Sequence, residues 1–164
     1  MSANWGGMEQ KLDELAALMP RGQRLLGIDL GTETIGVAVS DTSLAIATPH
    51  ETIRRTKFTR DAERLASLVK ERQAGGLVYG LPVNMDGTEG PRCQSTREFA
   101  REFARRCPLP YAFWDERLST AAVERMLTDE ADMSRKRRAE VVDRAAAAYI
   151  LQGALDALAR KRGR

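Results

Sequence analysis

The sequence predicts an α/β protein in which helices pack on the faces of a mixed sheet. Two observations support this prediction. Short apolar runs rich in β-branched residues alternate with segments whose apolar residues follow helical spacing. After a short N-terminal helix, their order is three strands, then helix, strand, helix, strand and two helices. The 164 residues are enough for one domain with a single core, so functional groups are expected at strand ends and in the following loops.

The first half of the chain is expected to form a short amphipathic helix and three consecutive strands. The helix covers residues 8–19, and Pro20 and Gly22 end it. The strands follow as a hairpin over residues 24–40 and a third strand over residues 45–53. A Gly-Thr-Glu-Thr sequence between the two apolar runs of the hairpin forms its turn.

In the second half of the chain, helices are expected to alternate with strands. Strands are predicted over residues 77–80 and 111–114, and helices over residues 59–73 and 91–106. Two further helices follow, one from a cap at Ser119 or Thr120 to about residue 130 and one from Ser134 to about residue 160. Gly75 and Gly76 are expected to end the first of these helices. Residues 81–91 contain two prolines and two glycines, and they form the longest predicted loop.

Composition excludes several classes of protein. No segment approaches the roughly 20 apolar residues that a membrane helix needs, and acidic residues interrupt the N-terminal stretch where a signal peptide would have its apolar region. We therefore expect a cytoplasmic protein that makes no membrane contact. Cys93 and Cys107 have the spacing of neither a zinc site nor a disulfide framework. Because His50 is the single histidine, catalysis must rest on carboxylates, hydroxyls or cations.

Charge is distributed unevenly along the chain. Residues 135–164 hold nine Lys or Arg against three Asp or Glu, so this stretch carries +6 and the remainder −3 of the net +3. Such a split is typical of chains that bind polyanions, although a solvated helical face with a basic tail also explains it. Lys136 and Arg137 begin the final predicted helix and are candidates for phosphate contacts. We divide the chain into an accessory helix (1–20), a main domain (21–160) and a basic tail (161–164).

Three carboxylates are difficult to explain as ordinary surface residues. Asp29 lies inside an apolar strand between two glycines, where a solvated sheet edge or a nearby arginine is the alternative explanation. Glu116 follows another strand directly, where a local ion pair would also account for it, and Asp143 lies within an apolar stretch of the final helix. Oxygen ligands without histidine favour Mg²⁺ or Mn²⁺, which can support two-metal hydrolysis of a phosphodiester.

Four stretches of the sequence resemble the YqgF family, also called RuvX. They are GIDLGTETIGVAVSD (27–41), YGLPVNMDGTEGP (79–91), DERLS (115–119) and VDRAAAAYILQ (142–152). They stand in the family's order, and the resemblance covers about residues 23–156. It implies a ribonuclease H-like fold and a metal-dependent nuclease that matures the 5′ end of 16S ribosomal RNA. The family is also described as Holliday junction resolvases, because of a likeness to RuvC.

The resemblance also assigns roles to individual residues. It makes Asp29 the metal carboxylate of the first strand, Glu116 the middle acid and Asp143 the acid of the final helix, with Glu116 chosen over its neighbour Asp115. The residues expected to contact nucleic acid, in addition to the two cations of the final helix, are Asn84, Arg92, Arg97 and Arg117. The expected partner is structured RNA, with branched DNA as the alternative.

Two other functions are compatible with parts of the sequence. Residues 27–32 followed by 37–39 are similar to the phosphate-binding hairpin of sugar kinases, actin and the 70-kDa chaperones. Those proteins close two such domains over ATP, and 164 residues supply one. A non-catalytic RNA-binding factor of ribosome assembly is the other alternative. The low aromatic content and the three acids argue against it, because a protein that only binds phosphates gains nothing from clustered negative charge.

Overall fold

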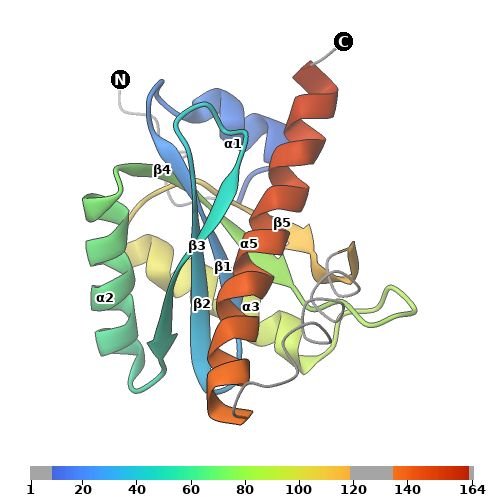
Figure 1. Cartoon of the computed structure of the whole chain (residues 1–164). Coiled ribbons are helices and arrows are strands. Elements are labelled where there is room, and N and C mark those ends of the chain that lie inside the picture. Colours follow the sequence, from blue (N-terminus) through green and yellow to red (C-terminus); the bar gives the residue numbers. More distant parts are fainter. Residues whose placement is uncertain (1–8, 119–134, 163–164) are drawn as a thin grey trace.

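The computed structural model describes residues 9–118 and 135–162, and it contains a five-stranded sheet with helices on its two faces (Figure 1). The strands are β1 (Arg24–Leu30), β2 (Thr34–Ser40), β3 (Ala47–Arg54), β4 (Ala74–Leu81) and β5 (Tyr111–Asp115). The helices are α1 (Leu12–Leu18), α2 (Phe58–Glu71), α3 (Pro91–Arg106) and α5 (Arg135–Arg162), with a 3-10 turn, η1 (Glu116–Leu118), after β5.

The strand order in the sheet is β3-β2-β1-β4-β5. Strands β1, β2 and β3 pair antiparallel, whereas β1 pairs with β4, and β4 with β5, in parallel. This arrangement confirms the predicted mixed sheet with helices on its faces. Because β1, β4 and β5 run in the same direction, their carboxyl ends lie at one edge of the sheet. Asp29 near the end of β1 and Glu116 after β5 therefore belong to that edge.

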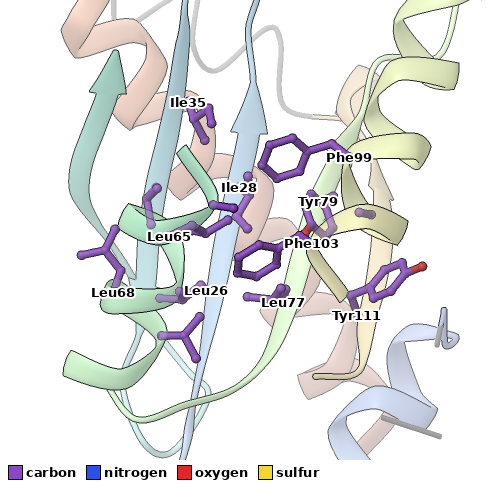
Figure 2. Packing of buried hydrophobic residues seen from close by; sticks show 14 of the residues in the cluster. Leu26, Ile28, Ile35, Leu65, Leu68, Leu77, Tyr79, Phe99, Phe103 and Tyr111 are labelled. Atoms are coloured by element: carbon purple, nitrogen blue, oxygen red, sulfur yellow. The ribbon is translucent and has the colours of Figure 1, made fainter. Parts of the chain in front are cut away.

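Each face of the sheet has its own apolar core. Leu26 and Ile28 of β1 pack on the face covered by α2 and α3, where Leu65 and Phe103 meet them (Figure 2). Leu25, from the alternate positions of β1, packs on the opposite face, in the cluster formed with α1 and α5. Since side chains alternate along a strand, Asp29 lies on the α5 face. Figure 1 shows α5 crossing that face of the sheet.

Small residues let α5 lie close to the strands. A Cβ atom added at Gly27 would lie 2.7 Å from Leu151 Cβ and 2.9 Å from the carbonyl oxygen of Ala147. A Cβ at Gly153 of α5 would lie 2.8 Å from Nε1 of Trp114, so the indole ring of Trp114 packs directly on the helix backbone. Neither Gly27 nor Gly153 has room for a larger residue. The contacts at these two glycines therefore set the distance between α5 and the sheet.

The N-terminal helix is shorter than predicted. Its apolar face packs as expected, since Leu15 is completely buried in the α5-side core. The backbone N–H of Gln10, however, donates to the carbonyl oxygen of Tyr111 at 2.8 Å, and Glu9 forms a parallel bridge with Tyr111. Residues 9 and 10 therefore extend the sheet beside β5, and α1 begins at Leu12.

The prediction that Gly75 and Gly76 end the second helix is wrong. Helix α2 ends at Glu71, Gln73 takes a left-handed conformation with φ 54°, and both glycines lie inside β4. A Cβ at Gly76 would lie 2.8 Å from Leu15 Cδ1. Gly76 therefore makes room for α1 on the sheet, a packing requirement between distant segments that local sequence does not show.

Some predictions fall outside the described residues. The helix predicted from a cap at Ser119 or Thr120 to about residue 130 lies outside the described residues. The predicted start of the final helix at Ser134 also lies outside them. Helix α5 runs to Arg162 and thus includes the first two residues of the predicted basic tail, where Lys161 Nζ lies 3.2 Å from Asp13 Oδ2. The division of the chain at residues 20 and 160 stays a prediction. In the part that the structure describes, no helix is both long and apolar enough to span a membrane.

Candidate active site

Asp29 and Glu116 come together at the carboxyl edge of the sheet. Strand β4 lies between β1, which carries Asp29, and β5, which Glu116 follows, and its Gly80 makes room for the side chains of Ile150 and Glu116. A Cβ at Gly80 would lie 3.0 Å from Glu116 Cγ and 3.2 Å from Glu116 Oε1, so the Glu116 side chain extends across β4. There it shares a hydrogen bond with the Asp29 carboxyl group. Two residues that are 87 positions apart thus form one pair of acids.

The environment of this pair favours a bound proton. Burial raises the pKa of Asp29 to about 8, and the hydrogen bond with Glu116 and its negative charge act in the same direction, whereas the charge of Arg92 lowers this pKa. Two carboxyl groups so close together cannot both ionise without compensation, so one proton is retained near neutral pH. A divalent cation would supply the missing compensation in place of that proton.

Asp115 has a different role from its neighbour Glu116. Its carboxylate Oδ2 accepts hydrogen bonds from Arg117 Nη2 at 2.6 Å and Nε at 2.9 Å, and Oδ1 accepts from the backbone N–H of Arg117 at 2.9 Å. These bonds lower the pKa of Asp115. Asp115 is therefore an ionised partner of Arg117. This geometry favours Glu116 as the acid that acts with Asp29.

The third predicted acid, Asp143, belongs to α5, but its side chain lies outside the described part of the structure. Its backbone position is one helical turn before Ala147, whose carbonyl oxygen lies over Gly27 of β1. Among the described residues, no group of three or more His, Cys, Asp or Glu side chains is arranged to hold a metal ion. The described site thus consists of the Asp29–Glu116 pair, and the role of Asp143 stays a prediction.

The loop that contains Asn84 is a tight turn beside this edge. The Asn84 backbone N–H donates to the Thr88 carbonyl oxygen at 2.8 Å, and its Nδ2 donates to Thr88 Oγ1 at 3.0 Å. Gly87 has φ +90°, a conformation that glycine adopts without strain. Arg117 Nη1 donates to the carbonyl oxygen of Met85 at 3.3 Å and so links the loop to η1. The Asn84 side chain therefore stabilises the turn, and its contact with nucleic acid stays a prediction.

The predicted cations differ in their surroundings. Arg97 binds Glu89 at 2.8 Å and Glu9 at 3.5 Å, and Arg117 binds Asp115, so each of these arginines already has a carboxylate partner. Arg92 has no salt bridge within the described residues, and its Nη2 donates to the carbonyl oxygen of Leu30 at 3.3 Å. Lys136 and Arg137 lie in the first turn of α5, and their side chains are outside the described part.

The sequence analysis missed Arg55, which follows the end of β3. The Arg55 Nη1 donates to the carbonyl oxygen of Gly31 at 2.6 Å, and the Arg55 backbone N–H donates to the carbonyl oxygen of Glu33 at 2.8 Å. These bonds place a second arginine at the turn after Asp29. The Arg-Arg pair at the end of the third strand was the available signal, but the sequence does not show which of the two faces the turn.

The raised pKa of Asp29 predicts how stability depends on pH. In the unfolded chain this carboxyl group titrates near its usual value of 3.8, whereas in the folded chain it titrates near 8. Between these values the folded state binds more protons, so the free energy of unfolding falls as the pH rises. The stabilisation is complete below about pH 4 and is lost as the pH rises through about 8. We expect the melting temperature of the wild type in chelator to fall over this range relative to that of Asp29→Asn, and a difference between the two that does not change with pH would contradict the raised pKa of Asp29.

The family comparison covers most of the chain. The family model described as "RuvX: Holliday junction resolvase" matches residues 23–157. A protein of Paramagnetospirillum magneticum named "Putative pre-16S rRNA nuclease" is 66% identical over 143 residues, which cover 87% of this chain and 92% of that protein. A protein of the same name from Rhodospirillum rubrum is 64% identical over 151 residues, which cover 92% and 94%.

Solved structures show the same architecture at low sequence identity. RuvC of T. thermophilus in complex with a Holliday junction substrate superposes with a TM-score of 0.55 at 15% identity, over 86% of this chain and 96% of that one. The yeast mitochondrial Holliday junction resolvase Ydc2 superposes with a TM-score of 0.56 at 11% identity, over 93% and 86%. These similarities confirm the expected ribonuclease H-like fold.

Proposed function

The chain belongs to the RuvX family, and from this we propose that it is a metal-dependent nuclease that hydrolyses phosphodiester bonds in 5′-end processing of pre-16S rRNA. The names of its relatives support the substrate, and we place the activity in the cytoplasm. The observation that carries the proposal is the Asp29–Glu116 pair, which joins two acids at the carboxyl edge of the sheet.

The described acids fit a divalent metal ion. They offer carboxyl oxygens at a partly buried position, and the retained proton marks a place where positive charge is favoured. Nucleases of this type generally use divalent metals, and oxygen ligands favour Mg²⁺ or Mn²⁺. We assign Asp29 and Glu116 as ligands, with Asp143 as the third. When bound, the metal supplies a Lewis acid for the phosphoryl oxygen and a lowered pKa for the attacking water.

The chain's own groups prepare the site for this chemistry. Asp29, whose raised pKa keeps it protonated near neutral pH, would lose this proton when a cation is near. Arg92, whose charge already lowers the pKa of Asp29, attracts a phosphate group toward the same edge. Helix α5 packs directly on the sheet at Gly27, two residues before Asp29 and on the same face of β1. Asn84, Arg97 and Arg117 support the neighbouring loop, and a phosphate would have to displace Glu89 or Asp115 to bind either arginine directly.

A cleavage assay with purified protein tests the proposal. The substrates are an RNA that spans the 5′ end of 16S rRNA with its leader, and a four-way DNA junction, each with Mg²⁺, with Mn²⁺ and with chelator. We expect cleavage of the RNA that requires metal. Cleavage of the junction alone would support the resolvase activity that the family model names. Binding of RNA with no cleavage under any condition would support a non-catalytic assembly factor, and titration with Mg-ATP is expected to show no binding.

The basic start of α5 is expected to contribute to binding of the substrate. Lys136 and Arg137 lie about two helical turns before Asp143 in the same helix, so phosphates bound there would lie near the site. If each cation neutralises one phosphate, changing both to alanine should flatten the log-log salt dependence of RNA affinity by roughly 1 to 2 units. The rate at saturating substrate should change much less, because these groups bind the ground state and the transition state alike.

The control for this double variant changes Arg101 and Arg105 to alanine, which removes the same charge from the exposed surface of α3. Its salt dependence should equal that of the wild type. If Arg137 instead pairs with Glu140 on the helix surface, the Lys136/Arg137 variant will keep the wild-type slope and affinity. That result would remove the start of α5 from the binding surface.

A further inference from the structure

A small cavity lies beside the turn that follows Asp29. It has a volume of about 100 Å³, and the residues that line it include Gly31, Thr32, Arg55, Arg92 and Ser95. Its volume is several times that needed for one water molecule. The cavity joins three elements that are distant in sequence, namely the β1–β2 turn, the end of β3 and the first turn of α3. We call it the Arg55–Arg92 pocket.

Two guanidinium groups line this pocket without a carboxylate partner. Arg55 donates to the carbonyl oxygen of Gly31 and Arg92 to that of Leu30, and neither forms a salt bridge with any residue that the structure describes. A guanidinium has five N–H donors, so both groups keep donors for another acceptor. Because like charges that share a cavity repel each other, an anion between them would relieve the repulsion and accept several charge-assisted hydrogen bonds.

The two arginines are held in place before any ligand binds. The guanidinium carbon of Arg55 lies 6.0 Å from the centre of the Phe99 ring, which belongs to the core between the sheet and α3. The Arg92 guanidinium is held through its Nη2, which donates to the carbonyl oxygen of Leu30 at 3.3 Å. Groups fixed in this way lose little conformational entropy when they bind, which favours a specific site over diffuse attraction.

The hydroxyl groups of Thr32 and Ser95 complete the lining with neutral donors. Both residues are exposed. Neither Glu33 nor Asp29 lines the pocket. Asp29 lies on the opposite face of β1 by strand alternation, where the charge of Arg92 still lowers its pKa. The lining therefore combines two cations with hydroxyl donors and contains no carboxylate, which is the donor pattern of an oxyanion site.

We propose that the Arg55–Arg92 pocket binds a backbone phosphate of the nucleic-acid strand, on the side of β1 opposite the acids and next to the scissile phosphate. This inference rests on the proposed nuclease function. Leu30 and Gly31 follow Asp29 directly and supply the carbonyl oxygens that hold the two arginines. A strand that crosses the carboxyl end of β1 thus meets the pocket and the acid pair in succession. The pocket fixes which linkage reaches the acids.

The test couples protein variants to single uncharged linkages in the substrate. A labelled RNA spanning the 5′ end of 16S rRNA is prepared with one methylphosphonate linkage at each position in turn, and its affinity is measured in chelator so that cleavage plays no part. We expect Arg55→Met to weaken binding of unmodified RNA by about tenfold. At one linkage the methylphosphonate should weaken RNA binding by the wild type by a similar factor. The same linkage should hardly change the RNA affinity of Arg55→Met, which has already lost the contact.

Arg54→Met is the matched control, because Arg54 is the preceding residue, carries the same charge and does not line the pocket. It should show the wild-type pattern of linkages. If Arg55→Met fails to fold, Arg92→Met replaces it in the same experiment. The proposal would be overturned if each methylphosphonate weakened RNA binding equally in the wild type and in Arg55→Met. A pocket that binds only free phosphate would give this same result, because no linkage of the RNA would then depend on Arg55.

The outcomes for the pocket and for the proposed function are separable. Coupling in chelator together with no metal-dependent cleavage would retain the phosphate pocket and reject the nuclease. Metal-dependent cleavage without coupling at any linkage would retain the nuclease and reject the pocket.

Discussion

Replacing Asp29 by asparagine is expected to abolish metal-dependent cleavage, with a loss of at least about a thousandfold, on the order of 4 kcal/mol of barrier. The amide keeps the shape of the side chain but removes its negative charge, so the site loses a metal ligand. The same change should raise the melting temperature in chelator at neutral pH. The Asp29 carboxyl group, whose folded pKa is about 8, must bind a proton when the chain folds, whereas the amide is neutral in both states. The rise should be roughly 2–4 °C for each kcal/mol of unfavourable interaction removed.

Single-turnover rates at saturating metal and thermal melts in chelator measure the two effects separately. Asp13→Asn is the control, since Asp13 is an aspartate on the surface that pairs with Lys161 at the far end of α5. It should keep the wild-type rate. Full activity of Asp29→Asn would reject Asp29 as a metal ligand, and an unfolded variant would show that Asp29 serves the fold instead.

Glu116→Gln is expected to slow cleavage by at least about a hundredfold, on the order of 3 kcal/mol of barrier, whereas Asp115→Asn should cost less. The reason lies in their different partners. Glu116 shares a hydrogen bond with Asp29, and Asp115 is bound by Arg117 at 2.6 Å. Loss of Glu116 therefore changes the acid pair itself, while loss of Asp115 releases Arg117 and loosens the loop that Arg117 holds at Met85.

Each of these two variants is the other's control, because they are adjacent and both lose one negative charge. Rates are compared at saturating substrate, and melting temperatures confirm that both variants fold. The opposite ranking, with Asp115→Asn the slower enzyme, would move the ligand to Asp115 and require Arg117 to release it.

Local sequence patterns predicted the order of the elements well. Alternation and apolar runs located β1, β2 and β4, because the buried faces of a sheet require them along each strand. They also showed that Asp29 was unusual, since an acid within a buried strand needs a partner. The family resemblance then paired it with Glu116. The structure adds the contact between the two acids across Gly80.

Features that depend on contacts between distant segments were not predictable in this way. Gly75 and Gly76 follow a helix, and local rules make glycines in that position a helix end. In the fold, Gly76 is required by Leu15, a residue sixty-one positions earlier in the chain. Arg55 was missed for the same reason, because its bond to Gly31 exists only once β3 has paired with β2.

The packing of Trp114 on Gly153 provides the protein with an optical reporter. The sequence contains two tryptophans, Trp5 and Trp114, so a Trp5→Phe variant would emit from the indole that touches α5. Indole fluorescence shifts to longer wavelength when water reaches the ring. If α5 moved away from the sheet, the emission maximum of Trp114 would shift. The packing of the helix that carries Asp143 could therefore be followed in real time without an attached dye.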